Sequence, residues 1–232
     1  GHHGQYIKQA ERKAFIERLH CKFGTSGGCW VYPPFRCHRQ RWFLPYTQKT
    51  GAHIKQLYAD GGRTTLYYQG PITNPGVEVN IAFGGKIMSD TSRRVEDVLA
   101  EVLEELYQPK NPAALAKLVE TFQLAENGYF SNMDYDADGI HLKALPAYPG
   151  PGELHIGFGI GLAGGTSAVP VYLLEPNLID KGRAAYAKAL EACLKNVCDI
   201  EDQFTAAQRI QRLKNSIYTA LDDVITIAYA RE

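Results

Sequence analysis

The sequence lacks a long apolar run and lacks an excess of either charge. Its longest apolar stretches, Ala168–Leu174 and Val224–Ala230, are far shorter than the roughly 18 residues that a membrane-spanning helix needs. Lysine and arginine together number 25, as do aspartate and glutamate, so the formal net charge is zero. Proteins that bind nucleic acids usually carry a basic surplus. We therefore expect neither a membrane nor a nucleic acid as a partner.

Cysteines are few, and their number is odd. Five cysteines cannot form a fully paired disulfide framework, which favours a reducing, cytoplasmic compartment. Three of them are evenly spaced, and two of these have a histidine neighbour: Cys21, Cys29 and Cys37, with His20 and His38. Structural zinc sites bring their ligands in close pairs, so this spacing argues for ordinary thiols. Cys193 and Cys198 lie on, or just past, an apolar helix, and we expect their side chains to pack in the apolar core beside it.

Helical periodicity is the main signal in the second half of the chain. Four helices are predicted, over residues 93–107, 112–128, 178–195 and 202–229. Ser92 or Thr91 can cap the first of them, and Asn111 before Pro112 can cap the second. A helical bundle is the simplest packing for residues 91–232.

The first 90 residues combine helix and strand signals. In chain order, the pattern predicts a helix at 5–19, a strand at 19–23, a long loop at 29–46, a helix at 52–59 and a strand at 64–68. Helix, strand and long loop in this order are typical of one unit of an α/β barrel. We therefore divide the chain into an α/β region at 1–90 and a helical domain at 91–232. The helical domain contains a Gly- and Pro-rich insertion at 132–176, with strands expected at 154–158 and 169–174.

The segment Gly70-Pro-Ile-Thr-Asn-Pro-Gly-Val-Glu-Val-Asn80 carries the strongest functional signal. Asn74 can cap the helix that Pro75 begins, which places Glu78 in the first turn, where the helix dipole favours a carboxylate. A polar turn is thus attached to a rigid helix. One interpretation is helix capping alone, and the other is a polar pocket beside the helix start.

Residues 60–130 resemble the region after the last strand of (β/α)8-barrel glycosidases, notably the retaining hexosaminidase-like families, where an Asn-Pro loop lines the sugar pocket and an acidic, alanine-rich helical region follows. The resemblance implies a fold of α/β followed by mainly α: the last βα units of a TIM-like barrel plus a helical bundle domain with a small Gly-rich β insertion. It also implies a carbohydrate-active protein that is part of a glycoside hydrolase. The principal acid residues of those families lie on middle barrel strands, for which a chain of this length has no room.

A cationic and aromatic cluster precedes the Asn-Pro segment. The residues expected to bind substrate are Arg36, His38, Arg41, Trp42 and Tyr46 of this cluster, together with Asn74 and Glu78. Guanidinium groups bind carboxylates bidentately and aromatic rings stack on apolar sugar faces, so the mixture suits a polar or anionic sugar. Alternatively, the aromatic rings cover a core and the arginines are solvated. The alternative function is a non-enzymatic helical module that binds a partner or a glycan.

An acidic turn in the insertion suggests one metal. Asp134, Asp136 and Asp138 alternate before Gly139, as oxygen ligands do in the first half of an EF-hand calcium loop. Position twelve of such a loop is Leu145, which cannot supply the bidentate carboxylate. Two interpretations therefore remain: a calcium site completed by backbone or distant ligands, or a solvated acidic turn. We expect no other cofactor.

Overall fold

The computed structural model describes residues 26–28, 43–59, 61–62, 64–66, 73–130, 133–136, 139–142 and 176–229. The helices are Thr47–Ala59 (α2), Pro75–Ser89 (α3), Val95–Tyr107 (α4), Pro112–Phe130 (α5), Pro176–Ile200 (α7) and Ala207–Tyr229 (α8), with a 3-10 turn at Glu201–Gln203 (η4). Short strands Ser26–Gly28 (β1) and Thr64–Leu66 (β2) pair in parallel, and Met133–Asp136 (β3) and Gly139–Leu142 (β4) pair antiparallel. The described part of the chain is thus mainly helical.

The four helices predicted for the second half are confirmed, with ends that differ by no more than five residues. Asn111 caps α5 as expected, because its Oδ1 accepts a hydrogen bond from the Ala114 N–H at 2.9 Å. The capping prediction for α4 is wrong: Arg94 occupies the cap position and makes no side-chain capping bond. The Ser92 hydroxyl instead donates to Asp90 Oδ1 at 2.6 Å within the turn between α3 and α4.

The predicted end of an α/β barrel is wrong. A barrel needs a closed ring of parallel strands covered by helices, whereas β1 and β2 form a two-stranded sheet of three residues each. Helix α3 buries Val79, Phe83 and Ile87 in a core shared with other helices. The helical pattern of residues 75–89 was thus compatible with either a sheet or a helix as partner, and the neighbours are helices.

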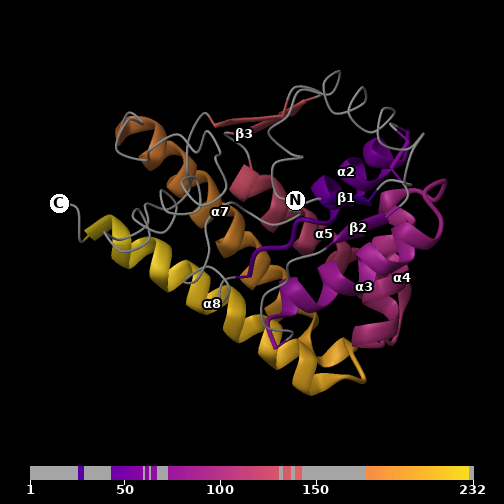
Figure 1. Cartoon of the computed structure of the whole chain (residues 1–232). Coiled ribbons are helices and arrows are strands. Elements are labelled where there is room, and N and C mark those ends of the chain that lie inside the picture. The colour runs from indigo at the N-terminus through magenta and orange to yellow at the C-terminus, as the bar shows by residue number, and fades with distance from the viewer. Residues whose placement is uncertain are drawn as a thin grey trace.

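One apolar core lies between the helices. Helices α3 and α4 pack side by side and against α2, while α7 packs on α5 and on α8 (Figure 1). Phe43 and Tyr107 both meet Phe122 of α5 edge-on, with ring centroids 4.9 and 6.2 Å apart. Gly51 of α2 lies where three helices converge, since a Cβ there would lie 2.6 Å from Val95 Cγ2 of α4 and 3.2 Å from Phe83 Cζ of α3. The core therefore contains side chains from both sides of residue 90.

Two interhelical turns pair with each other at one end of the bundle. The turn after α4 pairs with the one after α7, through a bridge between Pro109 and Phe204. The Lys110 N–H donates to the Gln203 carbonyl at 2.8 Å, and the Thr205 N–H donates to the Gln108 carbonyl at 3.0 Å. The N–H and carbonyl groups of the α4–α5 turn and of the α7–α8 turn thus form hydrogen bonds with one another.

Several predicted elements lie outside the described residues: the helix at 5–19 and the strands at 19–23, 154–158 and 169–174. Cys193 is buried on α7 as expected, whereas Cys198 is exposed, contrary to the prediction. Among the helices that the structure describes, none is both long and apolar enough to cross a membrane.

Two helical glycines should respond in opposite ways to alanine. A Cβ on Gly85, at the exposed face of α3, would meet no atom within 4 Å, whereas a Cβ on Gly128 of α5 would overlap Ala189 Cβ of α7. Because alanine favours helix over glycine, Gly85→Ala should raise the free energy of unfolding by roughly 0.5–1 kcal/mol. Gly128→Ala should lower it by about 1–3 kcal/mol, since the helices must separate. Urea denaturation measures both, and a stabilising Gly128→Ala would contradict the α5–α7 packing.

Candidate functional site at the start of helix α3

The first turn of α3 is capped as the sequence predicts. Asn74 has an extended backbone, and its Oδ1 accepts hydrogen bonds from the N–H groups of Gly76 and Val77 at 2.9 and 3.4 Å. Pro75 occupies the first helical position, where its missing N–H costs no hydrogen bond. The side chain of Asn74 is buried, so this polar turn is fixed in place.

The end of the cationic and aromatic segment lies directly on this turn. A Cβ added to Gly76 would lie 3.1 to 3.2 Å from the backbone C, N and O atoms of Leu44, so only glycine allows this close approach without a shift. One turn later, Asn80 Oδ1 accepts a hydrogen bond from the Tyr46 N–H at 3.2 Å. Residues 43–46 are therefore attached to the first two turns of α3, which joins the two regions that the sequence singled out.

Two predicted binding residues have structural contacts here. The side chain of Tyr46 is 3% exposed and belongs to the core, so it offers almost no ring face to a ligand from solvent. Glu78 forms an ion pair with Arg209, which links α3 to α8. Both charges lie beside Tyr107, whose pKa burial raises well above its ordinary value. Glu78 is therefore a half-buried interhelical contact.

The remaining predicted binding residues, Arg36, His38, Arg41 and Trp42, lie outside the described residues. The first described residue after them, Phe43, is buried and starts the stretch that contacts α3. The sugar-binding prediction for this group thus stays a prediction.

The calcium prediction also stays open. Asp134 and Asp136 lie in β3, where they pair with His141 and Gly139 of β4, whereas Asp138 is outside the described residues. Within the described ranges there is no group of three or more histidine, cysteine, aspartate or glutamate side chains that could hold a metal ion.

Glu126, a buried carboxylate of α5, is not among the residues that the sequence singled out. Its Oε2 accepts hydrogen bonds from the Gln48 N–H at 3.0 Å and the Thr47 hydroxyl at 3.3 Å, and its Oε1 accepts from the Lys49 N–H at 2.9 Å. Glu126 therefore caps the first turn of α2 from another helix. One signal could have revealed it: Glu126 lies four residues after Phe122, on the apolar face of α5.

Burial governs the acidity of Glu126. Removal of the carboxyl from water raises its pKa to about 7, and the N–H groups of Gln48 and Lys49 oppose this shift only in part. The Lys49 charge and the Thr47 hydroxyl also favour the ionised form. A carboxyl that titrates near neutral pH thus lies under the helix that follows residues 43–46.

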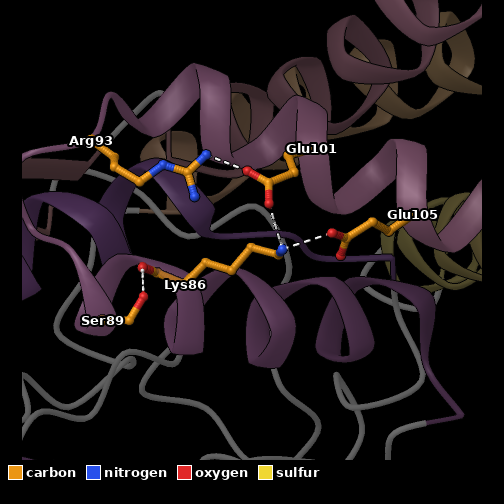
Figure 2. A network of polar contacts seen from close by, with 5 residues as sticks. All are labelled: Lys86, Ser89, Arg93, Glu101 and Glu105. Atoms are coloured by element: carbon orange, nitrogen blue, oxygen red, sulfur yellow. Dashed lines mark hydrogen bonds and ion pairs between the residues drawn. The ribbon is translucent and has the colours of Figure 1, made fainter.

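A surface network of charges joins α3 to α4 (Figure 2). Lys86 Nζ donates to Glu101 at 2.6 Å and to Glu105 at 2.8 Å, and Arg93 also binds Glu101. The hydrogen bonds from Lys86 and Arg93 lower the pKa of the Glu101 carboxyl. Figure 2 also shows the Ser89 hydroxyl donating to the Lys86 carbonyl, at 2.8 Å. These charges neutralise one another, so the network serves as an interhelical contact.

Loss of the Asn74 cap should weaken the junction. Asn74→Ala leaves two N–H groups of the first turn without their acceptor, which should lower the free energy of unfolding by about 1 kcal/mol. Asn74→Ser is the matched variant, because serine is also a strong capping residue and should recover most of the loss. Urea denaturation measures both, and equal stability of the alanine and serine variants would show that the cap contributes nothing.

Glu126 should make stability depend on pH. Because its pKa is raised in the folded state, the folded protein binds more protons, and this contribution to stability is present below about pH 4.5 and lost as pH rises through about 7. Glu126→Gln cannot titrate. The unfolding free energy of the wild type minus that of Glu126→Gln should therefore fall by roughly 3 kcal/mol between pH 4 and pH 8, at about 1.36 kcal/mol per pKa unit. A difference that does not change with pH would show that Glu126 keeps an ordinary pKa.

Comparison of the chain with protein-family models, with curated proteins and with solved structures gives no match. Three features of the described structure meet around Tyr46: the end of the cationic and aromatic segment, the start of α3 and the buried carboxylate under α2.

Proposed function

We propose that this protein is a non-enzymatic, helical glycan-binding module. In this proposal residues 36–46 bind a polar or anionic sugar beside the start of α3. The observation that carries the proposal is the attachment of residues 43–46 to α3, through the contact of Leu44 with Gly76 and the hydrogen bond from Tyr46 to Asn80. A rigid anchor of this kind lowers the entropy that a binding segment loses when a ligand docks.

The residue types in this segment suit a sugar ligand. The indole of Trp42 supplies an apolar face for stacking on a sugar ring. The guanidinium groups of Arg36 and Arg41 supply paired donors for a carboxylate, and His38 supplies a further hydrogen-bonding group.

The described carboxylates favour binding over hydrolysis. Glycoside hydrolysis uses two carboxyl groups placed on either side of the scissile bond. Beside the junction, Glu78 is paired with Arg209, and Glu126 is fully buried under the first turn of α2. Both groups thus have structural contacts, which supports a binding role for this part of the chain.

The proposal predicts which substitutions weaken sugar binding. Trp42→Ala removes a stacking surface and Arg41→Ala removes a charge-assisted hydrogen bond, so each should weaken binding by about 1–3 kcal/mol. Folding should survive both. Tyr218→Ala and Arg94→Ala are matched controls, because these exposed side chains lie on α8 and before α4 and should leave binding unchanged.

The measurement is a glycan array that includes neutral sugars and uronic acids, followed by saturation-transfer NMR on the sugars that bind. Binding that is indifferent to Trp42→Ala and Arg41→Ala would overturn the proposed site. If no saccharide binds, a helical protein-interaction module becomes the better hypothesis. The surface to test is then the outer line of α3, where Ile81 and Met88 are 38% and 41% exposed on either side of Gly85.

A further inference from the structure

The chain just before α2 is held by side chains of three helices. The Phe43 carbonyl accepts a hydrogen bond from the hydroxyl of Tyr186 of α7 at 2.7 Å, across 143 positions of the sequence. The Tyr46 N–H donates to Asn80 of α3. The Phe43 ring packs edge-on against Phe122 of α5. This short stretch of backbone therefore lies where α3, α5 and α7 meet.

The hydroxyl of Tyr186 donates from a rigid position. Its ring is fully buried and packs edge-on against Tyr129 of α5, with ring centroids 5.3 Å apart. Helices α5 and α7 also form the most extensive helix pair among the described residues. Gly128 allows this close approach, since a Cβ there would lie 3.6 Å from the Cα of Tyr186 and 2.3 Å from the Cβ of Ala189. Packing thus leaves the ring little freedom to follow a moving acceptor.

The hydrogen bond to Phe43 sets the orientation of a whole peptide group. Because a peptide bond is planar, a fixed Phe43 carbonyl also fixes the direction of the Leu44 N–H. The backbone of Leu44 in turn lies against Gly76 of α3. A buried carbonyl that loses its donor is costly, so without the Tyr186 hydroxyl this peptide group gains by turning toward another donor or toward water.

We infer that Tyr186 is a positioning residue for residues 43–46 and, through them, for the proposed glycan site. Its side chain is 0% exposed, so it acts through the Phe43 carbonyl and not through a contact with a ligand from solvent. The second part of the inference rests on the proposed function. Tyr186→Phe is the direct test, because it keeps the ring and its contact with Tyr129 and removes only the hydroxyl.

NMR of the full chain tests the positioning role without any sugar. In Tyr186→Phe the carbonyl carbon of Phe43 should shift upfield, as carbonyl carbons do when a donor is lost. Amide hydrogen exchange of the Tyr46 N–H should become about tenfold faster, because the peptide group at the start of the stretch is no longer held.

Ile87→Val is the matched control for a general loss of stability. It removes one buried methylene from α3, two turns beyond Asn80, and leaves every hydrogen bond of residues 43–46 in place. The Phe43 carbonyl shift should therefore not change in this variant. If a saccharide binds, its affinity should be about three- to tenfold weaker in Tyr186→Phe and unchanged in Ile87→Val.

The outcomes separate this inference from the proposed function. An unchanged Phe43 carbonyl shift and an unchanged Tyr46 exchange rate in Tyr186→Phe would overturn the positioning role, even if a saccharide binds. Equal affinity of the wild type and Tyr186→Phe for a bound saccharide would overturn the link to the glycan site. If no saccharide binds but both NMR changes occur, the positioning role is supported and only the proposed function fails.

Discussion

The buried carboxyl of Glu126 sets the strongest constraint on this structure. An apolar interior accepts a carboxyl only when its oxygens receive hydrogen bonds, and the first turn of a helix has N–H groups without acceptors. Helices α2 and α5 satisfy each other's requirement through the N–H groups of Gln48 and Lys49. The position of α2 on the bundle depends on this exchange.

A second, independent contact gives residues 43–46 a fixed path. Gly76 allows the backbone of Leu44 to approach α3 closely, and Asn80 accepts from the Tyr46 N–H. Because the Asn74 cap and the ion pairs of Lys86 with α4 stabilise α3, residues 43–46 lie against a rigid helix. Such pre-organisation favours binding by the adjacent segment, and it is compatible with a glycan or a protein as ligand.

The resemblance to barrel glycosidases located the junction but not the fold. The Asn-Pro cap at residues 74 and 75 is local, since the capping oxygen and the N–H groups it accepts are within three residues, and it is confirmed. The partners of α3 are not local. A helix with apolar residues at Val79, Phe83 and Ile87 packs equally well on a sheet or on other helices, so the same pattern fits both a barrel and a helical bundle.

The sequence by itself determined the helices of the second half and the caps at Asn74 and Asn111, because periodicity and capping act over three or four residues. It also determined the absence of an excess charge, which follows from composition alone. Only the tertiary structure decided the burial of Tyr46, the pairing of Glu78 with Arg209 and the capping of α2 by Glu126. The last two of these join residues more than 70 positions apart. Such contacts depend on which helix faces meet, and that choice is set by the packing of the whole core rather than by any short segment.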